Sequence, residues 1–265
     1  MAVLTANFCR LQESLRSLEE YSKIIDPDLS RQFERIRYAV YTLQRMTRVA
    51  EPQMGTLTKR LASAKLCLLV AGTHSTREFA HRVLPLAASG TIDVIQLRDK
   101  SLDDRKLLRR ARVLREITAK YGILFIMNDR SDLALLSDAD GVHLGQREIP
   151  VGDARRILGS SRLIGVSTHE REQAEAAVLA GADYLGAGPV FPSPTKSFAE
   201  YPGPDYLREI VGRIPQPIFA IGGITITNLP EVLATGASRV AVASAITESD
   251  RPVAAAESLR AILDA

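Results

Sequence analysis

The sequence predicts an α/β protein, namely a (β/α)8 TIM barrel preceded by an N-terminal helical hairpin. Eight short apolar runs alternate with helical patterns from residue 66 to the C-terminus. The runs are nearly continuous in apolar residues, as in parallel sheets that are buried on both faces. The length of 265 residues leaves room for one barrel and a short appendage. A doubly wound open sheet would normally carry fewer strands and a glycine-rich first turn, which residues 71–74 do not supply.

The expected strands are short runs rich in apolar and β-branched residues. They are Leu66–Ala71, Ile92–Leu97, Ile123–Met127, Gly141–Leu144, Leu163–Val166, Tyr184–Gly186, Ile218–Ile221 and Val240–Ala243. Stretches such as Asp103–Tyr121 and Glu170–Ala180, which lie between them, are rich in Ala, Leu, Arg and Glu and are expected to be helices. This regular alternation favours a closed barrel.

Two helices are expected before the barrel. Apolar residues recur at three- and four-residue steps over Phe8–Ile25 and again over Leu29–Leu43. Asp26-Pro27 separates them, with Asp suited to an N-cap and Pro to the first helical position. Pro52 and Gly55 indicate a linker over Ala50–Leu61, so we expect a helical extension and linker at 1–62 and a barrel domain at 63–265.

Composition favours a globular protein that acts on small molecules. Charged residues make up 25% of the chain, and the formal net charge of +3 lies in the first 60 residues. No aromatic-basic pattern indicates nucleic-acid binding, and no apolar run indicates a membrane span. Cys9 and Cys67 match neither a metal nor a redox spacing, so we expect reduced cysteines in a cytoplasmic protein.

Function in such barrels lies on the loops that follow the C-terminal strand ends. Gln96-Leu97-Arg98-Asp99-Lys100 ends the second strand, where Arg98 and Lys100 could grip a diphosphate. An ordinary charged loop with ion pairs through Asp99 is an equally good interpretation.

Two carboxylates follow the third and fourth strands. Asp129 and Glu148 can meet across adjacent strand ends, an arrangement that suits a Mg²⁺ ion that also takes water and phosphate ligands. Helix capping by Asp129 and a solvent-facing Glu148 are the alternative. His143 alternates with apolar neighbours and is expected to be a hydrogen-bonded residue of the barrel interior.

The later loops offer hydroxyls, glycines and one further cation. Ser167 precedes a helix, and the long loop at residues 188–196 carries two hydroxyls and Lys196, so it predicts a phosphate clamp or a lid, with a functionless turn as the alternative. Gly222-Gly223 and Ala243-Ser244 follow the seventh and eighth strands, where phosphate-binding barrels hold phosphate on backbone amides.

Taken together, these loops resemble the thiamine phosphate synthase family from about Leu66 to the C-terminus. The resemblance lies in six motifs in chain order: residues 96–100, Asn128-Asp129-Arg130, residues 140–146, residues 165–169, Gly188 to Lys196, and residues 220–224. The resemblance implies that Gln96, Leu97, Arg98, Asp99, Lys100, Asn128, Ser167 and Lys196 hold an aminopyrimidine diphosphate. It implies Asp129 and Glu148 as Mg²⁺ ligands, although the family usually has Asp at the second position. Ser193-Pro194-Thr195, Gly223, Ala243 and Ser244 would surround a thiazole phosphate.

The implied reaction is an alkyl or aryl transfer. It condenses 4-amino-2-methyl-5-(diphosphooxymethyl)pyrimidine with 4-methyl-5-(2-phosphooxyethyl)thiazole, giving thiamine phosphate and diphosphate. No nucleophilic side chain is needed, because the aminopyrimidine can delocalise the cation left when diphosphate departs. Arg98, Lys100 and Lys196 would be the catalytic residues, because they neutralise the charge on the leaving group. A thiazole tautomerase of the same superfamily and a non-catalytic ligand sensor are the rival interpretations.

Residues 7–21 also resemble a helical module that is fused ahead of some synthases of this family. A pyrimidine-phosphate kinase role has been proposed for that module. Here one hairpin is too small to enclose ATP, and the sequence carries no P-loop. We therefore expect a packing or oligomerisation element, and a possible homo-oligomer.

Overall fold

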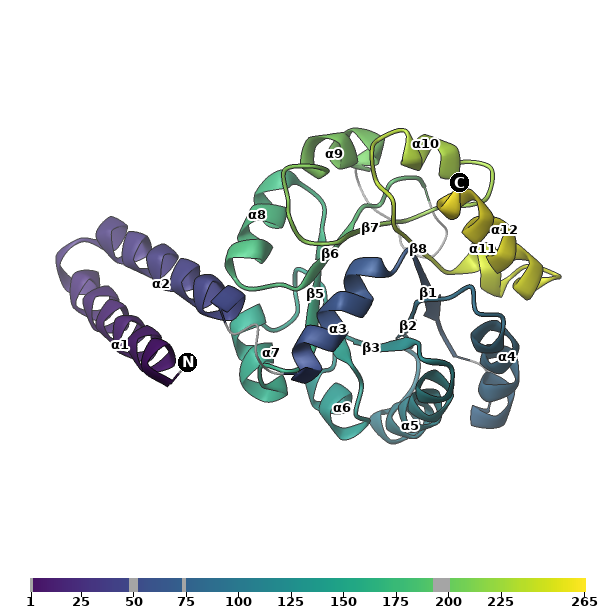
Figure 1. Ribbon diagram of the computed structural model, residues 1–265, viewed down its shortest axis with the longest axis horizontal. Coiled ribbons are helices and arrows are strands. Elements are labelled where there is room, and N and C mark those ends of the chain that lie inside the picture. The colour runs from purple at the N-terminus through teal and green to yellow at the C-terminus, as the bar shows by residue number, and fades with distance from the viewer. Residues whose placement is uncertain (1, 48–51, 73–74, 193–200) are drawn as a thin grey trace.

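Eight parallel strands close into a barrel in sequence order, with β8 paired to β1 (Figure 1). The computed structural model describes residues 2–47, 52–72, 75–192 and 201–265. The strands are β1 (Leu66–Val70), β2 (Val94–Leu97), β3 (Leu124–Asn128), β4 (Gly141–Leu144), β5 (Leu163–Thr168), β6 (Tyr184–Ala187), β7 (Ile218–Ile221) and β8 (Val240–Val242). The predicted (β/α)8 barrel is therefore confirmed, and every strand begins and ends within two residues of its predicted bounds.

Helices surround the sheet, as Figure 1 shows. They are α4 (Thr76–Ala88), α5 (Asp104–Tyr121), α6 (Ser131–Leu136), α7 (Val151–Leu158), α8 (Arg171–Leu179), α9 (Gly203–Ile210), α10 (Leu229–Leu233), α11 (Ser244–Thr247) and α12 (Pro252–Asp264). The ends of α5 follow from its sequence: the Asp103 carboxylate caps the first turn, and Gly122 ends the helix in the left-handed conformation. None of the described helices has the length and hydrophobicity that crossing a membrane requires.

Side chains alternate between the inside and the outside of the barrel along each strand. Outward residues pack against the helices and form the larger core, to which Leu97, Phe125, Met127, Ile164 and Leu185 belong. Inward residues form a second cluster that includes Val94, Leu124, Ile126, Leu163, Tyr184 and Phe219. This alternation decides which polar residues at the strand ends point into the barrel mouth.

The linker interpretation of Ala50–Leu61 is wrong where the structure describes it, because α3 (Pro52–Ser63) is a helix. Leu61, with 1% of its surface exposed, packs with the inward residues of the barrel, and Leu57 lies against the same cluster. Burial of this apolar face at the N-terminal end of the barrel outweighs the weak helix propensity that Gly55 confers. We therefore propose that the barrel unit begins with α3 rather than at residue 63.

The N-terminal hairpin consists of α1 (Ala2–Ile25) and α2 (Pro27–Thr47), which confirms the two predicted helices. The Asp26 carboxylate accepts a hydrogen bond from the backbone N–H of Asp28, as expected of an N-cap. Arg37 of α2 forms a 2.7 Å ion pair with Glu19 of α1. The hairpin projects from the side of the barrel, where α2 contacts α8 (Figure 1).

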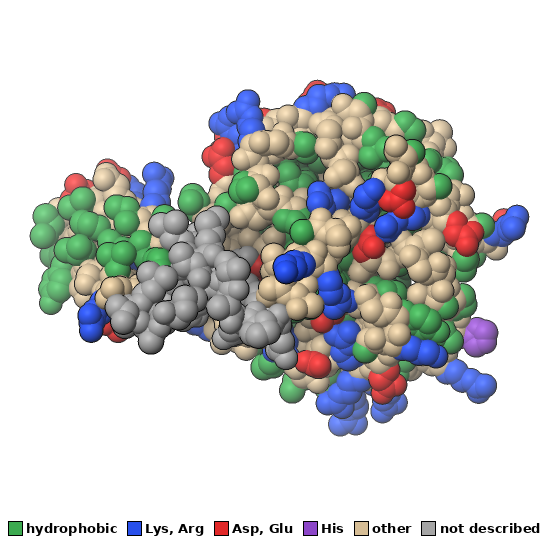
Figure 2. All heavy atoms as spheres, viewed as in Figure 1, with side chains coloured by type: hydrophobic (Ala, Val, Ile, Leu, Met, Phe, Trp, Pro, Cys, Tyr) green, Lys and Arg blue, Asp and Glu red, His purple; other side chains and the backbone are tan. Residues whose placement is uncertain are grey.

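Hydrophobic side chains gather on the face of the hairpin that Figure 2 shows, whereas charged side chains are frequent around the barrel. Among the hairpin side chains that the structure describes, Tyr21, Ile24 and Ile25, at the end of α1, are the most exposed large apolar residues. Such a concentration of exposed apolar surface is typical of regions that bind another protein surface.

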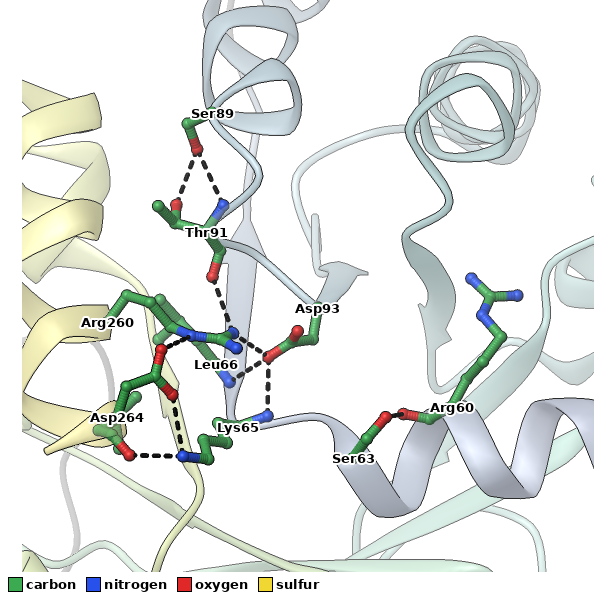
Figure 3. A network of polar contacts seen from close by, with 10 residues as sticks. Arg60, Ser63, Lys65, Leu66, Ser89, Thr91, Asp93, Arg260 and Asp264 are labelled. Atoms are coloured by element: carbon green, nitrogen blue, oxygen red, sulfur yellow. Dashed lines mark hydrogen bonds and ion pairs between the residues drawn. The ribbon is translucent and has the colours of Figure 1, made fainter.

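A network of charges closes the N-terminal end of the barrel (Figure 3). Asp93, just before β2, accepts hydrogen bonds from the backbone N–H groups of Lys65 and Leu66 and pairs with Arg260 at 2.8 Å. Arg260 also pairs with Asp264, which in turn pairs with the Lys65 ammonium. The first two strands are thereby tied to the last helix.

The same arrangement recurs before β4 and β6. Each time an aspartate accepts the backbone N–H of the preceding strand and pairs with an arginine of a neighbouring helix: Asp140 with Phe125 and Arg115, and Asp183 with Ile164 and Arg155. Asp93, Asp140 and Asp183 therefore each have both a backbone and a cationic partner, which offsets the cost of removing their charge from water.

Candidate active site at the C-terminal end of the barrel

A cavity of about 300 Å³ opens at the C-terminal ends of the strands. Seven residues predicted to bind substrate line it: Gln96, Arg98, Asn128, Ser167, Gly223, Ala243 and Ser244. They come from β2, β3 and β5 on one side and from the loops after β7 and β8 on the other. The structure thus brings together residues that are up to 148 positions apart in the chain.

Gln96, Arg98 and Asn128 are the polar side chains of β2 and β3 that point inward at the mouth. Gln96 is only 5% exposed. Within the described residues, none of the three side chains makes a hydrogen bond or an ion pair. Gln96 is buried and Arg98 and Asn128 are half-buried, and all three line the cavity, so their polar groups are available to a ligand there.

Asp129 lies at the same mouth, next to a cation. Its carboxylate pairs with the Lys100 ammonium at 2.9 Å. Its backbone has a positive φ of 62°, and its N–H donates to the His143 carbonyl on β4. The capping alternative is wrong, because Arg130 precedes α6 and no side-chain cap is present there.

Glu148 lies in the turn after β4, where its N–H donates to the Gly145 carbonyl at 3.3 Å. Its side chain folds back over Gly145, since Oε1 lies 4.0 Å from the point that a Cβ on this glycine would occupy. Glu148 is exposed, in agreement with the solvent-facing alternative, and it follows β4, the strand next to the one that carries Asp129. The described residues contain no group of three or more acidic, histidine or cysteine side chains around one point.

The side chains of Leu97 and Asp99 point outward. Leu97 is fully buried among the core residues. The Asp99 carboxylate pairs with Arg110 at 2.9 Å and accepts hydrogen bonds from the N–H and hydroxyl of Ser101. Asp99 does form an ion pair, but with Arg110 on α5 rather than within the loop, and its carboxylate anchors the loop that carries Arg98. Gly72 is required beside it, because any Cβ there would overlap the carboxylate.

Gly222 and Gly223 have positive φ values of 101° and 63°. The loop after β6 lies along them, with the Phe191 N–H donating to the Gly222 carbonyl, and a Cβ on Gly223 would lie 2.5 Å from the Pro192 carbonyl oxygen. Within the described part of the chain, the backbone N–H groups of Gly223 and Ser244 donate to no acceptor. Both residues line the cavity, so they can donate to an anion.

His143 is a hydrogen-bonded residue of the barrel interior, as predicted. Its Nε2 lies 2.9 Å from the Ser167 hydroxyl, and its Nδ1 lies 3.2 Å from the Tyr184 hydroxyl. Burial lowers the pKa of His143 to about 4; Asp129 opposes this shift and Arg98 adds to it. Burial raises the pKa of Tyr184 well above its ordinary value. Both side chains are therefore neutral near pH 7.

His169 also lines the cavity, although the sequence reasoning gave it no role. Its Nδ1 is hydrogen-bonded to the Gly188 carbonyl, which ties β5 to the loop after β6. Its position two residues after Ser167 was the available signal, because alternate residues of a strand face the same side. Ser193, Pro194, Thr195 and Lys196 lie outside the described residues, so their predicted roles stay predictions.

A closed parallel barrel whose polar cavity lies at the C-terminal strand ends is the architecture of a (β/α)8-barrel enzyme. The thiamine monophosphate synthase family matches residues 67–246, and the chain belongs to this family. The ThiD2 family matches residues 1–46, which contain α1 and most of α2.

Individual relatives extend the match over most of the chain. The thiamine-phosphate synthase of Thermosynechococcus vestitus is 44% identical over 97% of this chain and 72% of its own length. That of Rhodopirellula baltica is 40% identical over 99% of this chain and 71% of its own length. The solved thiamine phosphate pyrophosphorylase of Pyrococcus furiosus is 37% identical, with a TM-score of 0.69, over 78% of this chain and 98% of its own.

Proposed function

We propose that this chain is a thiamine phosphate synthase, a transferase that joins the pyrimidine diphosphate to the thiazole phosphate. The C–O bond between the pyrimidine methylene carbon and diphosphate breaks, and its electron pair leaves with diphosphate. The aminopyrimidine ring delocalises the resulting cation until the thiazole nitrogen supplies the pair for the new C–N bond. The products are thiamine phosphate and diphosphate.

The observation that carries this proposal is that Gln96, Arg98 and Asn128 line one wall of the cavity without a side-chain partner among the described residues. A guanidinium between two amides can bind several diphosphate oxygens at once, and its charge offsets the negative charge that grows as the C–O bond breaks. Lys100 lies on the same loop, paired with Asp129, and we expect it to contact the leaving group. We assign Lys196 the same task from the sequence alone.

The two carboxylates fit a divalent cation. Asp129 stands in a left-handed backbone conformation beside a cation, and Glu148 folds back over the neighbouring strand end. A pair of carboxylates suits Mg²⁺, which keeps several waters and shares phosphate oxygens. We propose Asp129 and Glu148 as its protein ligands. When bound, Mg²⁺ would supply positive charge to the diphosphate.

The opposite wall of the cavity suits the thiazole phosphate. The N–H groups of Gly223 and Ser244 have no acceptor among the described residues, and a glycine lets an anion approach the backbone closely. Ala243 contributes only backbone and a methyl group to this wall. Two anionic groups would thus be held on opposite sides of the cavity, so that the reacting carbon and nitrogen lie between them.

The decisive experiment is incubation of the purified chain with both substrates and Mg²⁺, followed by quantification of thiamine phosphate and diphosphate. Equal amounts of the two products are expected, and chelation of Mg²⁺ is expected to stop their formation. Isomerised thiazole phosphate without a C–N bond would indicate the tautomerase alternative. Binding of both substrates without any product would indicate the ligand sensor.

Two coarser features of the enzyme complete the proposal. The apolar hairpin surface around Tyr21, Ile24 and Ile25 supports a role in packing or oligomerisation. Light scattering tests this, and a monomer mass for the whole chain would contradict a homo-oligomer. The two free cysteines, Cys9 and Cys67, are compatible with a cytoplasmic location.

A further inference from the structure

Three polar side chains form a continuous hydrogen-bonded line from the barrel interior to the cavity. Tyr184 of β6 lies deepest, His143 of β4 is in the middle, and Ser167 of β5 is at the other end; both His143 and Ser167 line the cavity. The Tyr184 and His143 rings are buried and lie 5.5 Å apart between centroids. The proposed reaction gives neither ring a chemical task, yet both are polar groups in an otherwise apolar interior.

Two glycines make room for this line. A Cβ on Gly165 of β5 would overlap the Tyr184 ring, and a Cβ on Gly186 of β6 would lie 2.9 Å from the His143 ring. Neither glycine has a positive φ, so it is space rather than backbone conformation that requires them. Glycine at these two strand positions therefore leaves the space that the Tyr184 and His143 rings occupy.

The available donors and acceptors decide which group donates in each hydrogen bond of this line. Within the described residues, the only partner of the Tyr184 hydroxyl is His143 Nδ1. If the hydroxyl donates to Nδ1, the neutral imidazole carries its proton on Nε2 and donates it to the Ser167 oxygen. With the opposite direction, or with a doubly protonated ring, the buried phenol proton would have no acceptor among these residues, which is unfavourable.

We propose that Tyr184 and His143 are positioning residues that hold Ser167 as a hydrogen-bond donor toward the pyrimidine diphosphate. If the Ser167 oxygen accepts the His143 N–H, its own proton is not used in that contact and is available to donate to a ligand in the cavity. The substrate atom beside Ser167 is then an acceptor. The identity of that substrate rests on the proposed function, whereas the direction of the line is a property of the free protein.

The direct test needs no substrate. Nitrogen-15 NMR of the histidine rings in the free protein distinguishes the two neutral tautomers, and the His143 signals are assigned by their loss in His143→Gln. We expect the Nε2–H tautomer for His143. The Nδ1–H tautomer, or a cationic ring at neutral pH, would overturn the proposal even if the protein makes thiamine phosphate. If His143 has the expected tautomer but the protein makes no thiamine phosphate, the proposed function is contradicted and the direction of the hydrogen bonds is not.

Kinetics then separate positioning from mere packing. Tyr184→Phe keeps the ring that packs edge-on against Phe219 and removes only the hydroxyl. We expect the KM for the pyrimidine diphosphate to rise about five-fold, on the scale of one hydrogen bond, with the KM for the thiazole phosphate unchanged. Equal changes in the KM values for the two substrates, or no change in either, would overturn the proposal.

Tyr206→Phe is the matched control, since Tyr206 also loses a buried hydrogen bond, to the Thr168 hydroxyl at 2.7 Å, but lies outside the barrel interior. It should leave both KM values unchanged.

A second pair of variants tests the middle of the line. The glutamine in His143→Gln is long enough to place an amide N–H near the former Nε2 and donate to Ser167, whereas the shorter asparagine in His143→Asn is not. His143→Gln should therefore retain the lower KM for the pyrimidine diphosphate. The reverse order would contradict the proposed direction of the line.

Discussion

The two ends of the barrel treat their polar groups in opposite ways. At the N-terminal end, Asp93 has two backbone donors and an arginine partner, and the same arrangement recurs before β4 and β6. At the C-terminal end, Gln96, Arg98 and Asn128 line a cavity without a partner among the described residues. The difference indicates that one end holds the fold together while the other is kept available for ligands.

The apolar side chains show the same contrast. At the N-terminal end, Leu57 and Leu61 of α3 pack against the inward residues of the barrel. At the C-terminal end, Gly186 and Gly223 reduce the side-chain volume around the cavity. Changes at the first end should therefore alter stability, and changes at the second should alter activity.

The largest effect is expected from Arg98→Met. Loss of the guanidinium should lower kcat/KM for the pyrimidine diphosphate by about 10²–10³-fold, because the charge on the leaving group is no longer offset. The free energy of unfolding should change by less than about 0.5 kcal/mol, since no described protein group loses a partner. Steady-state kinetics and urea unfolding measure the two quantities.

Arg112→Met, on the exposed face of α5, is the control for Arg98→Met and should change neither quantity. A strongly destabilised but active Arg98→Met protein would contradict the view that the C-terminal end serves activity rather than stability.

Leu61→Ala should instead lower stability and leave activity unchanged. The truncation leaves a cavity under the barrel and should lower the free energy of unfolding by about 2–4 kcal/mol, with kcat/KM retained while the protein is folded. Leu84→Ala removes the same atoms from an exposed position of α4 and should cost far less. Equal losses in the two variants would show that α3 does not close the barrel.

His143 lies between the two ends and makes stability depend on pH. Its pKa is lowered to about 4 by burial, against 6.5 for the free side chain, so below pH 6.5 the unfolded chain binds a proton that the folded chain does not. The stability present above pH 6.5 is therefore lost as the pH falls toward 4, by about 2–3 kcal/mol. Urea unfolding of His143→Gln should show a shallower fall over this window, and identical slopes would contradict the assignment.

Of the four predicted changes, Asp93→Asn is expected to have the smallest effect on the protein. The amide keeps the shape of the side chain but weakens the pairing with Arg260, so the free energy of unfolding should fall by about 1–2 kcal/mol at unchanged kcat/KM. Asp153→Asn, which removes an exposed pair with Arg156, should cost less than about 0.5 kcal/mol. A loss of activity in Asp93→Asn would show that the N-terminal end shapes the active site.

Much of the fold could be predicted because its signals are local. Apolar runs and helix periodicity placed all eight strands and both hairpin helices, and Asp26-Pro27 marked the start of α2. α3 was mistaken for a linker because Pro52 and Gly55 indicate a break, and among its described side chains Leu57 and Leu61 carry the apolar face. Their burial depends on the barrel interior, which no local pattern shows.

Residue type and position after a strand were enough to predict most of the residues that line the cavity. Seven predicted residues do line the cavity. Leu97 and Asp99 were included with their neighbours, although strand alternation points their side chains away from it. The partner of Asp99 is Arg110 on α5, eleven residues further on, and only the folded helix brings it close. Likewise, the line from Tyr184 to Ser167 joins three strands, so no single motif contains it.

The most direct test of the whole account is a crystal structure of the protein with thiamine phosphate, diphosphate and Mg²⁺. We predict diphosphate against Gln96, Arg98 and Asn128, and the thiamine phosphate group on the N–H groups of Gly223 and Ser244. Anionic groups bound in the reverse positions, or at the N-terminal end of the barrel, would contradict it.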